Sequence, residues 1–451
     1  MSVQDINTIL FEGQKSGTSG LRKRVKIFQQ ELTLLHHYTE NFVRAIFDAI
    51  TLQGATFVVG SDGHYYSPEA VHKILQTASA NDVAKANGGP APEEVTDQTF
   101  AETKTISYKI INLPTVDISK IADTTYGPLK VSVIDSVADY LQFLEELFDV
   151  SLVKSFLKAH TSDFKVLFDS LHGVTGPYAR AILMDTMLSV QSCVPLPYLG
   201  GGHPGRNLTY AQSLVEVVER DDIAFGAASE GDGDHNMIYG KGAFVTPSDS
   251  IVIIADWADA IPYLKKGGVM DLGRSMPTCA SIDQVAKKKG PDYFEVLTGW
   301  KFFGNLMDAG RLSICGEEFF GTGSDRIRGE NGLWAIVAWL NIVAATNKGS
   351  SSFIRIRELL NQHYLTYGRS FCSHYYYEEV SSGDARRLVA HVDSLMAMSS
   401  FKGKAMCAQI SSASKPGDQR LNTQSGFLPS QIDGSEIQRG YYTTMVQGTP
   451  S

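Results

Sequence analysis

The segment IAFGAASEGDGD (Ile223–Asp234) predicts both a strand and the loop that follows it. Ile223–Ala228 is a short apolar run, and the acidic sequence Glu230–Asp234 comes almost directly after it. Similar arrangements lie earlier in the chain, in VVGSDG (Val58–Gly63) and VLFDSLHG (Val166–Gly173). Because open α/β sheets bind ligands beyond the carboxyl ends of their strands, all three turns are candidate site loops. For the two earlier turns, glycines that serve only the backbone geometry stay an open alternative.

Outside this segment the pattern alternates between strands and helices. Further strands are predicted at 55–60, 164–169, 293–297 and 312–315, and helices at 31–52, 176–187, 249–265, 333–346 and 353–367. Another helix begins at Ser67, where Ser-Pro is typical of an N-cap with proline in the first turn. Strands separated by helix-length segments are typical of βαβ units, so the sequence predicts an α/β protein with mixed or parallel sheets.

The composition is that of a folded protein with several domains. The chain has 451 residues, of which 43% are hydrophobic and 20% charged, and its 40 Lys and Arg against 49 Asp and Glu give a formal net charge of −9. This acidic balance argues against a nucleic-acid binder, which needs a basic surface. A phosphorylated small substrate stays open, because a local cluster of cations can bind what the whole protein repels.

The sequence indicates neither a secreted nor a membrane-spanning protein. The N-terminus lacks a basic segment followed by an apolar core, and the most apolar stretches fall short of the about 20 residues that a membrane span needs. The five cysteines are odd in number, far apart and without CxxC spacing, which favours a reducing compartment. We therefore expect a cytoplasmic location and no transmembrane segment.

Three carboxylates alternate with glycines in the acidic loop, at Glu230, Asp232 and Asp234. Glycine lets the backbone curl, so that these side chains can converge. Converged carboxylates repel one another unless a cation lies between them, and oxygen ligands favour Mg²⁺ or Ca²⁺ over zinc. A solvated acidic turn is the alternative, but the position after a buried strand favours a metal site.

Two further segments have the composition of ligand-binding loops. SGTSGLRKR (Ser16–Arg24) combines small hydroxyl residues and glycines with a run of cations, which together can bind a phosphate. CGEEFFGTGSD (Cys315–Asp325) places adjacent carboxylates before a glycine loop, and such carboxylates can pair with sugar hydroxyls. Each also has an interpretation without function, a solvated basic face for the first and an acidic strand end for the second.

Taken together, the chain resembles the phosphoglucomutases of the α-D-phosphohexomutase superfamily. The matching motifs follow the family's order from about residue 12 to 405. They are GTSGLRKRV (17–25), NGGPAPEEVTDQTF (87–100), HGVTGPY (172–178), HPGRNLTYA (203–211), EGDGDHNM (230–237), RSMPT (274–278), TGWKFFGNLMDA (298–309), CGEEFFGTGSDRIR (315–328) and YGRSF (367–371). A single one of these motifs would be weak, whereas the whole ordered set is highly specific.

The resemblance implies an α/β, multi-domain architecture with mixed sheets flanked by helices around a central cleft. It implies domain I at 1–135, shortened near 85–87, domain II with the metal loop at 136–245, domain III with the sugar-binding loop at 246–366, and a remnant of domain IV at 367–405. The range 406–451 is rich in Ser, Gln, Gly and Pro without a sustained period, which predicts a disordered tail.

The family interconverts glucose 1-phosphate and glucose 6-phosphate through glucose 1,6-bisphosphate, with Mg²⁺ and a phosphoserine that donates the phosphoryl group. The resemblance therefore implies these hexose phosphates as partners, Mg²⁺ as cofactor and a place in glucose metabolism. The metal ligands that it implies are Glu230, Asp232 and Asp234. The substrate-binding residues that it implies are Thr18, Ser19, Arg22, His235, Thr298, Gly299 and Glu317.

The chain departs from the family pattern at residues that carry the chemistry. The family's nucleophile loop, T-A-S-H-N-P, belongs between the helix near Ala80 and NGGPAP, but here NDVAKA (Asn81–Ala86) runs straight into that motif. His235 stands where the family has Arg, Phe319 where it has Ser, and Glu330 where it has Lys. The phosphate loop of domain IV is missing from the sequence as well. We therefore expect no catalytic nucleophile and an impaired or inactive chain.

Three interpretations stay open. The chain is a Mg²⁺-dependent phosphoglucomutase, a non-catalytic structural or secretion-linked relative with a cytoskeletal or vesicle partner, or an incomplete product. The exchanges at His235, Phe319 and Glu330 fit divergence, whereas the internal join and the tail fit truncation. We favour a diverged member that is also truncated.

Overall fold

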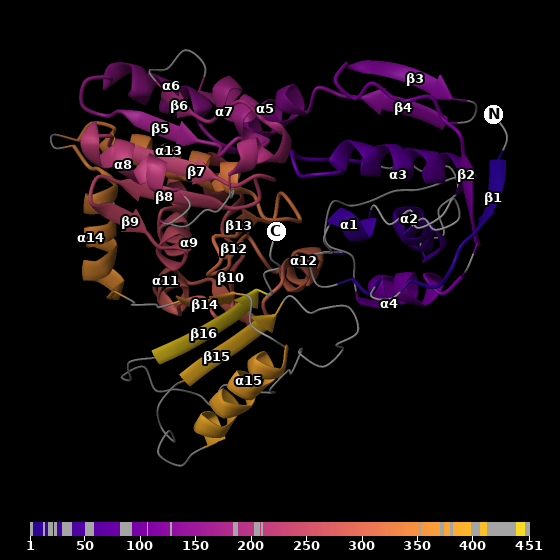
Figure 1. Ribbon diagram of the computed structural model, residues 1–451. Helices are drawn as coiled ribbons and strands as arrows, with labels where there is room; N and C mark the ends of the chain where they lie inside the picture. Colours follow the sequence, from indigo (N-terminus) through magenta and orange to yellow (C-terminus); the bar gives the residue numbers. More distant parts are fainter. Residues whose placement is uncertain are drawn as a thin grey trace. The chain divides into compact units, whose positions relative to one another are not determined.

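The computed structural model in Figure 1 divides the chain into two compact units, Met1–Phe11 with Lys15–Gly368, and Glu12–Gln14 with Arg369–Ser451. The structure describes residues 3–11, 14–16, 21, 25–28, 38–49, 58–81, 93–105, 107–126, 129–183, 188–202, 208, 211–350, 353–369, 374–378, 382–397, 406–412 and 439–446. All of the predicted site residues that it describes lie in the first unit.

The N-terminal part of the first unit combines short helices with two antiparallel strand pairs. β1 (Val3–Asn7) pairs with β2 (Ser107–Ile111), and β3 (Ala122–Tyr126) pairs with β4 (Leu129–Val133). The helices are α1 (Val25–Phe28), α2 (Tyr38–Ala49), α3 (Ser67–Asn81) and α4 (Glu93–Glu102). α3 begins at Ser67 as predicted. The strand predicted at 55–60 differs: residues 58–60 are not in a strand, and 55–57 lie outside the described residues.

A five-stranded mixed sheet follows, in the order β6-β5-β7-β8-β9. Its strands are β5 (Val166–Asp169), β6 (Leu188–Gln191), β7 (Phe225–Ser229), β8 (Asn236–Gly240) and β9 (Ala243–Val245). β5, β6 and β7 are parallel, whereas β8 and β9 return antiparallel. The helices of this part are α5 (Ser136–Leu147), α6 (Val150–Ala159), α7 (Thr175–Ile182) and α8 (Gln212–Arg220), with the 3-10 turn η1 (Pro197–Gly201).

Both faces of this sheet are buried. Phe168 and Phe225 belong to the large core cluster, whereas Leu167 packs in a second cluster with Leu214 and Val218 of α8. This alternation is the period of two that a strand imposes on its side chains. The near-continuous apolar runs by which the sequence predicted β5 and β7 are typical of strands covered on both sides.

A second mixed sheet, in the order β11-β10-β12-β13, carries the other site loops. Its strands are β10 (Asp271–Ser275), β11 (Asp292–Val296), β12 (Ile314–Gly316) and β13 (Thr322–Ser324), and only β13 runs antiparallel to its neighbour. The helices are α9 (Pro247–Asp256), α10 (Pro262–Gly267), α11 (Ser281–Lys289), α12 (Trp300–Asp308) and α14 (Ile356–Tyr367), with the 3-10 turn η2 (Ala258–Ala260). The helix predicted at 249–265 is thus interrupted; Pro262, which lacks an N–H, begins a new helix.

Helix α13 (Gly332–Asn347) joins the two sheets. It is apolar around almost its whole circumference, which predicts a helix buried on all sides. It contacts β7 and β8 of the first sheet, β13 of the second, and α6 and α9. Its N-cap, Asn331, accepts a hydrogen bond from the backbone N of Trp334 at 2.9 Å, so the helix begins at a defined residue.

The second unit contains β14 (His374–Glu378), α15 (Ser382–Ala397), β15 (Met406–Ser412) and β16 (Arg439–Val446). Its parallel sheet has the order β14-β16-β15. β15 and β16 lie in the range for which the composition predicted a disordered tail. The physical reason for the difference is local: RGYYTTMV (Arg439–Val446) is rich in aromatic and β-branched residues, which favour strands.

Two findings concern the apolar stretches and the cysteines of the sequence. Among the described residues, no helix combines the length and the apolar character that would let it cross a membrane. Cys193, Cys279 and Cys315, the cysteines whose side chains the structure describes, are free thiols.

Candidate functional site

The acidic loop joins β7 to β8 and lies against two other segments. The backbone N of Val174, in the loop after β5, donates to the carbonyl of Gly231 at 3.0 Å, and the backbone N of Gly332 donates to that of Gly233 at 3.1 Å. The approach needs glycine at Gly173, where a Cβ would lie 2.7 Å from the carbonyl oxygen of Glu230. Since β5 and β7 are parallel neighbours, their carboxyl ends meet at one edge, as the sequence predicted.

His235 lies at the centre of a carboxylate cluster. Its Nδ1 contacts Glu230 and lies 2.5 Å from Oδ1 of Asp234, and its Nε2 lies 2.7 Å from Oε2 of Glu330. The side chains of His235 and Glu230 are only 13% and 10% exposed. Burial alone lowers the pKa of an imidazole, but Glu330 and the other two carboxylates outweigh it and hold the pKa of His235 well above its ordinary value.

Glu330 connects this cluster to the sugar-binding loop that the sequence predicted. The backbone of His235 forms a β-bridge with Gly321. A Cβ on Gly321 would lie 2.8 Å from the carboxyl carbon of Glu330, so that carboxylate packs directly on the loop. Burial and then the charge of Glu330 raise the pKa of Glu317 to about 8. Glu317 therefore holds a proton at neutral pH and can donate a hydrogen bond to a ligand as well as accept one.

The loop that follows β11 meets the same carboxyl group. The backbone N of Gly299 donates to Oε1 of Glu317 at 3.0 Å. Gly299 has φ 125°, a conformation that favours glycine, and it is the N-cap of α12. The structure thus brings Gly299, the adjacent Thr298 and Glu317 to one place.

Asp232 differs from its two neighbours in the loop. Part of its side chain is exposed, yet partial burial and then the charge of Asp234 raise its pKa to about 6. The closely grouped potential ligand atoms are those of Glu230, Asp234 and His235, which all lie within 4.8 Å of one another. Whether Asp232 ligates a metal stays a prediction.

This donor set fits a divalent cation, because two carboxylates and an imidazole nitrogen converge in a partly buried loop. It does not make the all-oxygen set that Mg²⁺ prefers. The resemblance implied three carboxylate ligands, Glu230, Asp232 and Asp234, whereas the group in the structure contains the imidazole nitrogen of His235 in place of Asp232.

The remaining predicted residues, Thr18, Ser19 and Arg22, lie outside the described residues. The join near Lys85–Asn87, where the nucleophile loop is missing, also lies outside them. Of the predicted site, the structure therefore brings together Glu230, Asp234, His235, Thr298, Gly299 and Glu317, and it places Asp232 beside Asp234.

Several neighbours of the site were not found from the sequence. Asp62, in the turn before α3, adds to the negative charge that Asp232 experiences. Arg274, in the motif RSMPT, is buried and pairs with Asp283 and Glu295. The sequence had indicated the glycine turn at Asp62 and the motif of Arg274, but not these contacts, because they join residues from 9 to 170 positions apart that only the fold brings together.

Glu318, next to Glu317, predicts a pH-dependent stability. It is 2% exposed and accepts a hydrogen bond from Ser248, and burial raises its pKa to about 7. Because this pKa is above the ordinary value of 4.5, the folded state holds the proton of Glu318 more tightly than the unfolded state does. The stability that this proton contributes is complete below pH 4.5 and is lost as the pH rises through 7. The free energy of unfolding of wild type should therefore fall between pH 5 and pH 8 by about 2–3 kcal/mol more than that of the Glu318→Gln variant, which has no carboxyl group to ionise.

Urea denaturation at the two pH values measures this difference. Asp222→Asn, which alters an exposed carboxylate paired with Lys241, is the matched control and should change the pH dependence little. An equal pH dependence in wild type and Glu318→Gln would contradict the prediction.

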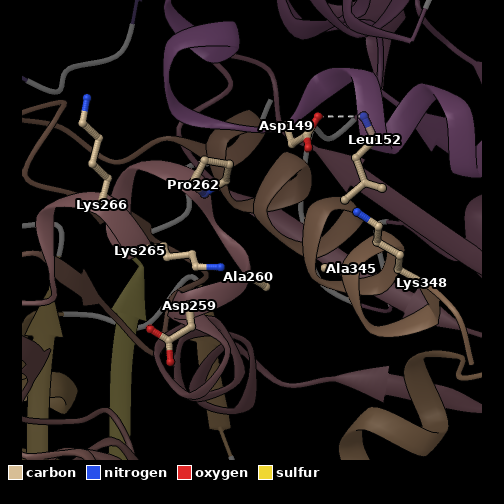
Figure 2. Close-up of a pocket in the computed structure, with 9 residues that line it drawn as sticks. All are labelled: Asp149, Leu152, Asp259, Ala260, Pro262, Lys265, Lys266, Ala345 and Lys348. Carbon is tan, nitrogen blue, oxygen red and sulfur yellow. Dashed lines mark hydrogen bonds between the residues drawn. The ribbon is translucent and has the colours of Figure 1, made fainter.

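A pocket of about 380 Å³ lies elsewhere on the first unit. Figure 2 shows its lining residues, which are Asp149, Leu152, Asp259, Ala260, Pro262, Lys265, Lys266, Ala345 and Lys348. In the figure, the Lys266 side chain points away from the others. No predicted site residue lines this pocket, so the candidate site remains the cluster around His235.

Two family models match this chain. Residues 13–110 match phosphoglucomutase/phosphomannomutase, alpha/beta/alpha domain I, and residues 247–362 match alpha/beta/alpha domain III of the same family. Both ranges fall within those expected for domains I and III.

Curated proteins resemble almost the whole chain. It is 42% identical to a phosphoglucomutase of Schizosaccharomyces pombe over 503 aligned positions, which cover 99% of this chain and 88% of the relative. It is also 42% identical to a phosphoglucomutase of Aspergillus fumigatus, over 100% of this chain and 88% of the relative. The second alignment includes the range 406–451, which the motifs did not reach. Both alignments are longer than this chain, so both contain gaps in it.

Among solved structures, the exocytosis-sensitive phosphoprotein pp63/parafusin of Paramecium, a phosphoglucomutase in its open form, is similar with a TM-score of 0.77. The identity is 34%, and the match covers 87% of this chain and 81% of that one.

Proposed function

This chain belongs to the α-D-phosphohexomutase family, and from that premise we propose that it binds a hexose phosphate together with a divalent cation but does not transfer the phosphoryl group. The family's phosphoglucomutases are isomerases of carbohydrate metabolism. The observation that carries the binding half of the proposal is the β-bridge between His235 and Gly321, which holds the acidic loop against the loop of Glu317.

The residues of the site support recognition of a sugar. Glu317, with its pKa of about 8, can donate a hydrogen bond to a sugar oxygen or accept one from a hydroxyl. The N-cap Gly299 fixes that carboxyl group through its backbone N–H. The expected ligands remain glucose 1-phosphate, glucose 6-phosphate and glucose 1,6-bisphosphate. Mg²⁺ is the cation that the family resemblance implies, and when bound it would neutralise phosphate charge.

The missing nucleophile supports the second half of the proposal. Phosphoryl transfer through a covalent intermediate needs a side chain that accepts and returns the group, and positioning alone does not replace it. The sequence runs from Asn81 to the NGGPAP motif without the family's serine. The pairing of His235 with Glu330 further reduces the positive charge available to a phosphate.

A paired assay of binding and turnover tests the proposal. We expect calorimetry to detect binding of glucose 1-phosphate to the chain in the presence of a divalent cation. We expect a coupled assay, primed with a trace of glucose 1,6-bisphosphate, to detect no formation of glucose 6-phosphate above the blank. The Schizosaccharomyces pombe relative, assayed in parallel, verifies the reagents. Turnover comparable to that relative would overturn the proposal, as would the absence of any hexose-phosphate binding.

One variant sharpens this test. Glu330→Lys places the family's cation beside His235 and should tighten glucose 1-phosphate binding about tenfold, equal to about 1.4 kcal/mol, still without turnover. Asp292→Lys makes the same charge change at an exposed carboxylate of β11 and should leave the affinity nearly unchanged. Equal gains in both variants would mean that the charge of the whole protein, rather than this site, governs binding.

A second candidate function is a non-catalytic role in secretion or the cytoskeleton. The likeness to the exocytosis-sensitive phosphoprotein pp63/parafusin favours the secretion-linked form of this role. Co-sedimentation with actin filaments, and separately with vesicles that contain anionic lipids, tests this role. Saturable binding to filaments or to vesicles, together with no binding of glucose 1-phosphate, would favour this non-catalytic role over the first proposal.

A further inference from the structure

We propose that Glu230, Asp234 and His235 form a mixed oxygen and nitrogen site that binds a divalent transition-metal ion, of the class of Zn²⁺, more tightly than Mg²⁺. The inference deepens the proposed function and rests on it in one respect, that the loop between β7 and β8 is a metal loop.

The first argument is the position of the histidine nitrogen. Nδ1 of His235 contacts a carboxylate oxygen of Glu230 and lies 2.5 Å from Oδ1 of Asp234. One ligand atom from each of the three residues lies within 4.8 Å of the other two. A cation that binds both carboxylates therefore meets the imidazole nitrogen at the same time, unless the side chain of His235 moves away.

The second argument is that Glu330 lies beside the other ring nitrogen of the imidazole. Its Oε2 lies 2.7 Å from Nε2 of His235, and its side chain is only 14% exposed. Histidines that bind metals commonly donate their second ring nitrogen to a carboxylate, which fixes the tautomer and makes the ligating nitrogen more basic. Glu330 lies within ion-pair distance of Nε2, close enough to orient His235 in this way after a small change in its geometry.

The third argument is that the loop is braced before an ion arrives. Gly231 and Gly233 accept backbone hydrogen bonds from Val174 and Gly332, which belong to two different segments. The bridge between His235 and Gly321 fixes a third point. A site on a braced loop loses little conformational freedom when the ion binds, so the donors themselves determine its selectivity.

The chemistry of the donors then selects the ion. Imidazole suits Zn²⁺ and its neighbours, whereas Mg²⁺ prefers six oxygens in octahedral geometry and gives up its water reluctantly. Two carboxylates and one imidazole leave a fourth tetrahedral position for water or a ligand, which is the donor count of open zinc sites. With Glu330 and Asp232 nearby, the charge around the site also favours a dication.

The competing reading is that His235 itself is the cation of the site. A protonated imidazole between Glu230, Asp234 and Glu330 would satisfy these carboxylates without a metal. The two readings differ in what a metal titration shows, because a permanent imidazolium leaves no nitrogen lone pair for an ion.

Calorimetric titration of the chelator-treated full chain with Zn²⁺ and with Mg²⁺, without sugar, tests the inference. We expect one Zn²⁺ per chain, bound on the order of 100-fold more tightly than Mg²⁺. His235→Arg, which introduces the family's residue, should remove this preference, and Glu330→Gln should weaken Zn²⁺ binding about 10- to 100-fold. Equal affinities for the two ions, or no Zn²⁺ binding, would overturn the inference in favour of the imidazolium.

A spectroscopic readout separates ligation from a structural role. Spin-echo EPR of the chain loaded with Cu²⁺ should show coupling to ¹⁴N of one imidazole, which should be lost in His235→Arg and kept in His160→Ala. His160 is a matched control because its ring contacts Phe156 and Phe353 and belongs to no potential metal group in the described residues. If His235→Arg fails to fold, the isosteric Asp234→Asn must lower Zn²⁺ affinity for the inference to survive.

The two proposals fail in different ways. Tight Zn²⁺ binding without any affinity for glucose 1-phosphate would leave the metal site standing and overturn the proposed function. Binding of glucose 1-phosphate with equal affinities for Mg²⁺ and Zn²⁺ would keep the proposed function and overturn the preference for a transition metal.

Discussion

Asp283→Ala is expected to lower the free energy of unfolding by about 3 kcal/mol or more. Asp283 accepts two hydrogen bonds from Arg274, from Nε at 2.8 Å and from Nη2 at 2.9 Å, and both side chains are at most 10% exposed. Without Asp283, a buried guanidinium keeps Glu295 as its remaining carboxylate partner at 2.6 Å. Because Glu295 is partly exposed, it compensates the charge incompletely, so the loss falls near the lower end of about 3–5 kcal/mol.

Urea denaturation measures this loss. Asp222→Ala breaks the exposed pair with Lys241 and serves as the control, with an expected change of at most about 1 kcal/mol. The double variant Arg274→Met with Asp283→Leu, which replaces the pair by apolar side chains, should recover most of the stability. A loss below about 1 kcal/mol in Asp283→Ala would mean that Glu295 alone satisfies the arginine.

Trp339→Ala is expected to cost about 3–5 kcal/mol. Trp339 is fully buried in α13 and donates from Nε1 to Oγ of Ser250 in α9 at 2.8 Å. Removal of the indole leaves a cavity in the core cluster between the two sheets and leaves the Ser250 hydroxyl without this donor. Both effects destabilise the folded state, and the cavity is the larger.

Trp339→Phe and Ser250→Ala separate these effects. Ser250→Ala removes only the hydrogen bond and should cost about 1–2 kcal/mol, and Trp339→Phe should fall between it and Trp339→Ala. If Trp339→Ala cost no more than Ser250→Ala, the core around α13 would have to collapse into the space left by the indole.

The local sequence predicts the strands and the site loops well where burial and turns coincide. Val166–Asp169 and Phe225–Ser229 have apolar runs that end in polar glycine turns, and both are strands of the five-stranded sheet. The short antiparallel strands β8, β9 and β13 escaped this reasoning. They are three to five residues long, and they are set by pairing with neighbours rather than by a pattern of their own.

The candidate site shows the same division. The spacing of Glu230 and Asp234 indicated convergence, and the two carboxylates do converge. The place of His235 between them, and of Glu330 behind it, could not be read from the sequence, because Glu330 is 95 positions further along the chain and reaches the loop only through the fold. Long-range pairs of this kind are determined by topology, which local patterns do not specify.

Because α13 packs against both mixed sheets, the stability of each sheet depends on that of the other. A helix that contacts β7 and β8 of one sheet and β13 of the other cannot leave without exposing the hydrophobic core cluster that the two sheets share. The segments 136–245 and 246–366 should therefore melt in one cooperative step. A protein cut at residue 245 would yield two fragments that are each insoluble alone and that regain solubility only when they are refolded together.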